Sequence, residues 1–140
     1  MKQHNQYQDF KVNVKIKLAL LWSAVMFCYI YGDYFQLYVP GKVEGLIGGN
    51  NMLDNPFKLL MASLLLAIPA LMVCLSVFLK PVTNRFLNLL LGTFYTALML
   101  LIALTSYSDW HMFYVFLAIL ESILTAIIVI NAYKWPKNKE

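Results

Sequence analysis

The sequence predicts an all-α fold, a four-helix transmembrane bundle, from its composition, its apolar runs and its placement of charge. Of the 140 residues, 61% are hydrophobic and 13% are charged, whereas soluble domains are about 45–50% apolar and about 25% charged. The mean hydropathy is +0.65. A chain of this length buries too small a fraction of its surface to hide so much apolar area from water. The lipid bilayer is therefore its expected surrounding.

Four apolar runs reach the roughly 20 residues that a spanning helix needs. They cover about residues 18–39, 57–79, 86–105 and 112–132. The chain has no room for a second unit beside these runs, so residues 1–140 are expected to form a single membrane domain.

Turn and capping residues separate the runs. Pro40-Gly41 ends the first run, and Asp54 or Asn55 can cap the second, where Pro56 occupies the first helical position. Residues 41–55, the longest connection, are expected to form a short interfacial helix or a lid over the mouth of the bundle. The candidate caps of the last two runs are Thr83, Asn84, Ser106, Ser108 and Asp109.

The distribution of basic residues predicts the orientation. Nine of them fall on the side that holds both termini, and only Lys42 and Lys58 fall on the other. Since cytoplasmic segments carry the excess of Lys and Arg, both termini are expected in the cytoplasm. The net charge of +4 sits in short segments between apolar runs, which suits an anionic leaflet and excludes nucleic acid as a partner. The nine are Lys2, Lys11, Lys15, Lys17, Lys80, Arg85, Lys134, Lys137 and Lys139.

Small and polar residues line one face of each run, and membrane helices pack through such faces. We therefore expect these stripes to face the interior of the bundle. Pro69, in the middle of the second run, should kink that helix. The stripes are Trp22, Met26, Tyr29, Asp33 and Gln36; Ser63, Ala67, Ala70 and Cys74; Asn88, Gly92, Tyr95 and Met99; and Ala118, Ser122 and Ala126. The outer aromatic belt is assigned to Tyr34, Tyr38, Trp110 and Tyr114.

Two carboxylates within the apolar runs carry the functional argument. Asp33 and Glu121 each cost at least about 2.5–3.5 kcal/mol to insert, so such residues usually face the interior and serve a function. No Lys, Arg or His lies in the interior of any run. Three states stay open: protonated carboxyls, carboxylates held by hydroxyl donors, or carboxylates that bind a proton or a cationic ligand. The hydroxyl donors considered are Tyr29, Tyr95, Thr96 and Ser63.

Both acids belong to the outer half of the bundle. Asp33 lies six residues from the outer end of its run, about 9 Å, and Glu121 nine residues from its own, about 13 Å. They can therefore share one cavity, with tyrosine rings supplying cation–π faces. The alternatives without a ligand are that Asp33 is hydrated at headgroup level and that Glu121 makes a structural hydrogen bond. The candidate ligand-binding residues are Asp33, Glu121, Tyr29, Tyr34, Tyr95 and Thr125.

The remaining residues indicate no other chemistry. Cys28 and Cys74 lie at different predicted depths and are interpreted as packing residues without a disulfide. No His/Cys/Asp/Glu cluster has metal-ligand spacing, and no nucleophile motif or glycine-rich phosphate loop is present. Neither a metal nor another cofactor is predicted.

The chain resembles a family of small uncharacterised bacterial membrane proteins with four helices. The resemblance covers nearly all of residues 21–135, with Gly32 and Tyr133 where that family more often has Ala and Trp. It implies a bacterial inner-membrane location and acidic positions at Asp33 and Glu121, but no activity. More loosely, the layout is similar to DoxX-like four-helix bundles. The residues that carry the resemblance are Trp22, Tyr31-Gly32-Asp33, Pro40-Gly41, Ile68-Pro69-Ala70, Leu79-Lys80, Asn84-Arg85, Asn88, Gly92, Glu121 and Tyr133-Lys134-Trp135.

Three functions are open. The first is a small-molecule or ion-binding membrane protein, a transporter or its subunit, whose acids bind a proton or a small cationic or amphipathic ligand. The second is a non-catalytic assembly subunit, in a homo-oligomer or with a membrane partner that supplies Lys or Arg to Glu121. An enzyme is the weakest, because acids alone do not make a redox site. An interior Glu121 favours the first function and a lipid-facing Glu121 the second.

Overall fold

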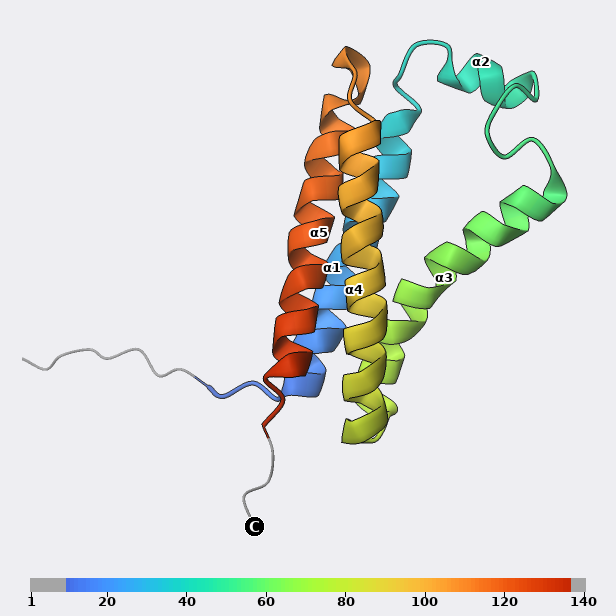
Figure 1. The fold of residues 1–140 in the computed structure, drawn as a ribbon. Helices are drawn as coiled ribbons and strands as arrows, with labels where there is room; N and C mark the ends of the chain where they lie inside the picture. The colour runs from blue at the N-terminus through green and yellow to red at the C-terminus, as the bar shows by residue number, and fades with distance from the viewer. Residues whose placement is uncertain (1–9, 137–140) are drawn as a thin grey trace, which may run out of the picture.

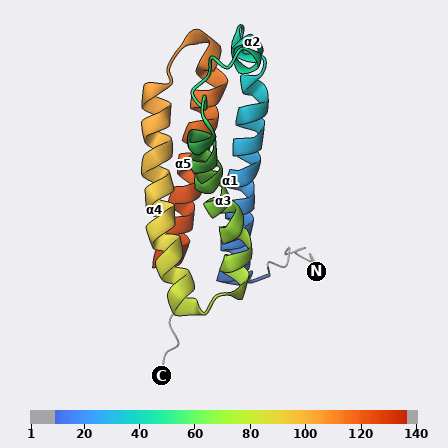
Figure 2. The same ribbon diagram turned by 90° about the vertical axis from the view of Figure 1, so that its right-hand side faces the viewer.

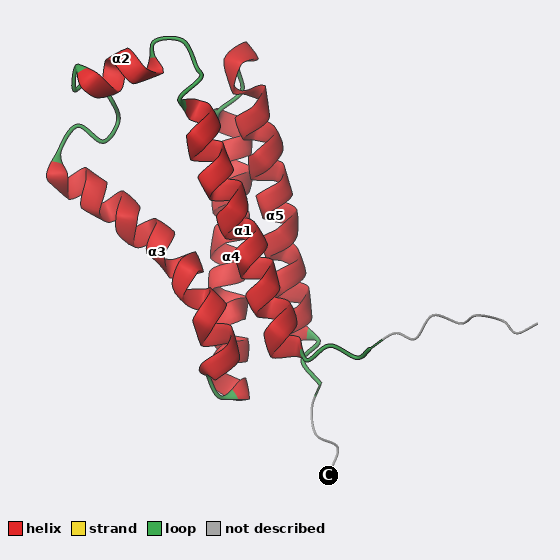
Figure 3. Cartoon of the chain, turned by 180° about the vertical axis from the view of Figure 1, so that it is seen from behind, coloured by secondary structure: helices red, strands yellow, loops and turns green. Residues whose placement is uncertain are grey.

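The computed structural model describes residues 10–136, which contain helices and connecting turns but no strand (Figures 1 and 3). Four of these segments, with η1 counted together with α5, are long and apolar enough to cross a membrane. The predicted all-α fold with four long helices is therefore confirmed. The elements are α1 (Val14–Gln36), α2 (Lys42–Ile47), α3 (Pro56–Phe78), α4 (Pro81–Thr105), η1 (Asp109–His111) and α5 (Met112–Tyr133).

Three of the long helices pack side by side, and the fourth joins them along only part of its length. α5 lies against both α1 and α4, and it approaches α4 closely at Gly92, where an added Cβ would come within 2.8 Å of Val129 Cγ2. α3 packs on α1 near the end of the bundle where α1 begins and α5 ends, which we call the termini end (Figure 1). Toward the opposite end, the α2 end, α3 leans away from the other helices (Figures 1 and 3).

The first helix begins earlier than the predicted span. The Asn13 side chain caps α1 by accepting a hydrogen bond from the Lys15 amide at 2.9 Å. Lys15 belongs to the first turn of α1, and its ammonium group donates to the carbonyls of Val77 and Leu79 at the end of α3. These carbonyls have no partner within their own helix, so the lysine stabilises the terminus.

The third long helix also begins before the predicted residue 86. Pro81 occupies the first turn of α4, with Lys80 as the N-cap residue. Asn84 is therefore inside the helix, and its side chain donates to the Ser76 carbonyl of α3 instead of capping. By contrast, the predicted cap of α3 is present, since Asn55 accepts from the amides of Phe57 and Lys58.

The interior faces of α1, α4 and α5 largely follow the predicted stripes, but that of α3 does not. Ser63, Ala70 and Cys74 are exposed, and the buried residues of α3 are instead Pro69 and Met72 together with Ser76. The positions of small residues do not determine which face of α3 is buried. Instead, α3 is oriented so that its Ser76 and Leu65 carbonyls accept hydrogen bonds from side chains of α4. The face of α3 predicted from small residues is therefore wrong.

A buried chain of hydrogen bonds joins three helices near the termini end. Trp22 Nε1 of α1 donates to Asn88 Oδ1 of α4 at 2.8 Å, and Asn88 Nδ2 donates to Asn84 Oδ1 at 2.7 Å. Asn84 Nδ2 then donates to the Ser76 carbonyl of α3. All four residues are buried. Since a buried polar group left without a partner costs about 1–3 kcal/mol, the chain holds α1, α3 and α4 in one register.

Pro69 sets the point at which α3 leaves the bundle. Proline has no amide hydrogen, so the Leu65 carbonyl one turn earlier has no helical donor. The Tyr95 hydroxyl of α4 donates to that carbonyl at 2.6 Å. Trp22 packs edge-on against the Tyr95 ring, with centroids 5.9 Å apart. This hydrogen bond fixes α3 at the level of Pro69. Residues 56–68, the half of α3 toward the α2 end, diverge from the other three long helices.

We expect Tyr95→Phe to lower the free energy of unfolding by about 1–3 kcal/mol, because it leaves the Leu65 carbonyl unpaired. In a Pro69→Ala background the new amide N–H can bind the same carbonyl, so the loss of the hydroxyl should cost clearly less. Reversible unfolding in mixed micelles of the wild type, Tyr95→Phe, Pro69→Ala and the double variant measures the coupling between the two positions. An equal cost in both backgrounds would contradict the pairing.

Candidate functional site

A cavity of about 290 Å³ lies beneath the diverging half of α3. Helices α1, α3, α4 and α5 all contribute to its wall. Its volume falls at the lower end of the range for small-molecule sites, about 300–1,000 Å³. Ten of the fifteen lining residues are apolar: Gly32, Leu53, Ala62, Leu65, Leu66, Leu98, Met99, Ile102, Leu117 and Ala118.

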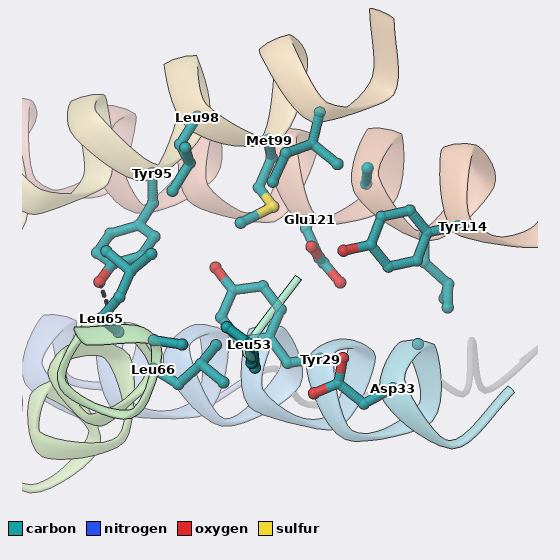
Figure 4. A pocket seen from close by; sticks show the side chains of 15 residues that line it. Tyr29, Asp33, Leu53, Leu65, Leu66, Tyr95, Leu98, Met99, Tyr114 and Glu121 are labelled. Atoms are coloured by element: carbon teal, nitrogen blue, oxygen red, sulfur yellow. Dashed lines mark hydrogen bonds between the residues drawn. The ribbon is translucent and has the colours of Figure 1, made fainter. Parts of the chain in front are cut away.

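The two predicted acids reach this cavity from neighbouring helices. Asp33 comes from α1 and Glu121 from α5, and Figure 4 shows both carboxylates directed into the space between the helices. Glu121 is 5% exposed, whereas Asp33 is exposed near the α2 end. Glu121 is therefore the inner acid of the cavity and Asp33 the outer one.

Neither carboxylate is paired with a protein group. Among residues 10–136, the hydrogen bonds and ion pairs include none to the side chain of Asp33 or Glu121; the ion pair there joins Lys58 to Asp54 at 2.6 Å. None of the described residues that line the cavity is Lys, Arg or His. Lys42 of α2 forms no ion pair with Asp33. Within residues 10–136, Glu121 therefore has no basic partner.

Three tyrosines supply the remaining polar lining. Tyr29 is 8% exposed, and its hydroxyl is buried without a hydrogen-bond partner among residues 10–136. The Tyr114 hydroxyl points toward the Glu121 carboxylate in Figure 4. The Tyr95 hydroxyl is already engaged by the Leu65 carbonyl. Two phenol groups near the acids therefore have no hydrogen-bond partner among residues 10–136.

The structure brings four of the six predicted site residues together. Asp33, Glu121, Tyr29 and Tyr95 line the cavity, while the other two lie outside its lining. Tyr34 faces outward, and its hydroxyl lies 2.7 Å from that of Tyr38.

Thr125 is one helical turn beyond Glu121 and fully buried, but it packs toward α4. Its hydroxyl donates to the Glu121 carbonyl and accepts from the Thr96 hydroxyl at 2.8 Å. This places it in the contact between α4 and α5, where it fixes the helix that carries Glu121.

One cavity residue, Tyr114, was assigned from the sequence to the outer aromatic belt. It lies seven residues before Glu121 on the same helix. Because seven residues are close to two helical turns, Tyr114 shares a face with Glu121. That spacing was the signal that could have placed it in the site.

The described residues contain neither a metal-binding cluster nor a disulfide at this site. Residues 10–136 hold no group of three His, Cys, Asp or Glu side chains that could bind a metal ion. Cys28 and Cys74 are free thiols. The cavity therefore offers carboxylates, phenols and apolar walls.

The four apolar helices define a helical membrane protein. Residues 6–140 match the model of a family of unknown function (DUF6326), and the chain belongs to that family. This agrees with the expected membership of an uncharacterised family. No curated protein and no solved structure matches the chain. The function is therefore argued from the cavity itself.

We expect Glu121→Met to raise the free energy of unfolding by about 1–3 kcal/mol, because a buried polar group without a partner is replaced by an apolar one. Thr125→Val is the matched control on the same helix. It should lower stability by about 1 kcal/mol, because its hydroxyl is hydrogen-bonded. Denaturation in micelles without added ligand compares the two. A loss of stability in Glu121→Met equal to that of Thr125→Val would mean that Glu121 has a structural role.

Proposed function

We propose that this protein binds a small cationic ligand in the cavity between Asp33 and Glu121. The observation that carries the proposal is that two carboxylates from different helices line one cavity without a basic side chain. Retaining unpaired acids in an apolar interior costs stability, and such residues commonly mark ion or substrate sites.

A cation supplies what this site lacks. Ionised carboxylates only accept hydrogen bonds, and an ammonium group only donates them. The attraction is stronger in the low-dielectric interior than in water. Tyrosine faces add cation–π attraction. Because Glu121 can hold a proton or an organic cation but not both, the site suits an exchange of the two. Such an exchange is the chemistry of proton-coupled transport.

Burial of Glu121 favours this proposal over an assembly subunit. A subunit that pairs Glu121 with a Lys or Arg of another membrane protein would present the carboxylate to lipid. Instead Glu121 is 5% exposed and lines the cavity.

For the orientation, we propose four membrane crossings with both termini in the cytoplasm of a bacterium, the chain lying in its inner membrane. The positions of the described basic residues support this. Lys15, Arg85 and Lys134 belong to helix ends at the termini end, and Lys42 and Lys58 to the α2 end. Lys2, Lys137 and Lys139 lie outside the described residues. In this orientation, Asp33 and the cavity lie toward the outer face.

We expect n-hexylammonium to bind the protein in lipid nanodiscs, while the neutral n-hexanol binds much more weakly. Glu121→Gln should weaken hexylammonium binding by about 10–100-fold, because this factor corresponds to the free energy that a hydrogen bond to a charged group contributes. Calorimetric titration measures both. Glu44→Gln, an exposed carboxylate on α2, is the control and should leave the affinity unchanged. Equal binding to wild type and Glu121→Gln would refute the site.

Single cysteines introduced at Glu44 and at Lys134, in a chain whose Cys28 and Cys74 are replaced by alanine, should label from opposite sides of the membrane. Both positions are exposed. An impermeant maleimide applied to intact cells should react with the cysteine at Glu44 and not with that at Lys134. Labelling of both from one side would overturn the orientation.

A further inference from the structure

We propose that the ligand of the cavity is an amphipathic amine with an alkyl chain, which reaches the site sideways from the bilayer beneath residues 56–68 of α3. The inference rests on the cationic site proposed above. It adds the class of ligand and the path that the ligand takes.

The diverging half of α3 creates the path. Figure 2, viewed from the side of α3, shows this helix in front of α5 and between α4 and α1. Ala62 and Leu66 of α3 line the cavity opposite Leu98 and Ile102 of α4. Leu66 lies ten residues into α3, about 15 Å along the helix, which is half of a hydrocarbon core of about 30 Å. At that depth, an opening beside α3 would face acyl chains and not water.

The connection between α2 and α3 also contributes to the cavity wall. Leu53, in the connection between α2 and α3, lines the cavity together with the helices and occupies its centre in the view of Figure 4. The turn that carries it is held by the Leu53 amide, which donates to the Asn51 side chain at 2.9 Å. An apolar side chain from this connection therefore forms part of the cavity wall that a ligand would contact.

The acidic groups of the cavity lie toward the α2 end and its apolar residues lie deeper, the same order as the polar and apolar parts of an amphipathic molecule in a leaflet. Asp33 lies three residues from the end of α1, about 5 Å from the α2 end. Glu121 lies nine residues into α5, about 13 Å deep, and the apolar Leu66 deeper still. An alkylamine in a bilayer likewise holds its ammonium group near the interface and its chain in the hydrocarbon. It can thus move sideways into the cavity without turning over.

The unpartnered hydroxyl of Tyr29 is independent support for a ligand. It is buried without a hydrogen-bond partner in the described part of the chain, and in Figure 4 it is directed away from Asp33 of its own helix. Buried polar groups are nearly always hydrogen-bonded, so an orphan in a cavity wall points to a molecule that fills the space.

The test is a series of primary alkylammonium ions from propyl to octyl, titrated into the protein in nanodiscs. Glu121→Gln under the same conditions corrects for partition into lipid. The part of binding that needs Glu121 should tighten about fourfold for each added methylene until the cavity is full. Tetramethylammonium, which has no apolar chain, should bind at least 100-fold more weakly than octylammonium.

Two variants of adjacent residues test the path. Ala62→Phe places a ring in the lateral gap and should slow both association and dissociation of octylammonium at least tenfold, as followed by stopped-flow fluorescence. Ser63→Phe is the matched control, since Ser63 is exposed on the other face of α3 and is not part of the cavity lining. Its rates should stay within twofold of wild type. Should Ala62→Phe not fold, Ala62→Leu tests the same path with a smaller side chain.

The outcomes separate the two proposals. Binding that requires Glu121 but is equal for propylammonium and octylammonium, with unchanged rates in the Ala62 variants, overturns this inference and leaves the cationic site standing. Absence of any binding that requires Glu121 overturns the proposed function itself. Chain-length dependence together with slowed rates in Ala62→Phe, but not in Ser63→Phe, supports both.

Discussion

The absent amide hydrogen of Pro69 is the constraint on which the candidate site depends. It frees the Leu65 carbonyl, which the Tyr95 hydroxyl then binds across the interface between α3 and α4. This bond holds α3 at the level of Pro69, while the turns before it receive no comparable support and lean outward. The space so opened contains Asp33 and Glu121. A straight α3 packed along its whole length would fill that space with leucine side chains, so the kink creates the room that the acids require.

The two ends of the bundle are built differently. Near the termini end, hydrogen bonds run from Trp22 through Asn88 and Asn84 to the Ser76 carbonyl and join three helices, although the Ser76 hydroxyl is buried without a partner among the described residues. Toward the α2 end, the Tyr29 hydroxyl is buried without a partner among residues 10–136, and the hydrogen bonds within this range include none to the Glu121 carboxylate. Satisfied networks stabilise one arrangement of helices, whereas unsatisfied groups lower stability locally. A hydrogen-bonded half thus supports a half in which the Glu121 carboxylate and the Tyr29 hydroxyl lack protein partners within residues 10–136.

The sequence was sufficient to predict the four long helices, the acids on two inner faces, and the kink at Pro69, because run length, charge cost and proline chemistry act locally. It was not sufficient to predict which face of α3 is buried. That face depends on donors of α4 that meet the Ser76 and Leu65 carbonyls, and small residues such as Ser63 and Ala70 carry no such information. Tyr114 was misassigned because an aromatic residue near an interface fits a belt as well as a cavity. Whether Asp33 and Glu121 bind a cation stays a prediction.

Lys15 and Arg85 each perform two tasks, and this links the topology of the chain to its folding. Lys15 donates to the last carbonyls of α3, and the Arg85 guanidinium donates to the Ala132 carbonyl at the end of α5. The same two cations contribute to the charge bias from which the orientation was predicted. Moving positive charge from one face to the other, the usual way to invert a small membrane protein, would therefore also fray two helix termini. A variant whose orientation was changed by removing these two charges would therefore also lose the hydrogen bonds that complete the ends of α3 and α5.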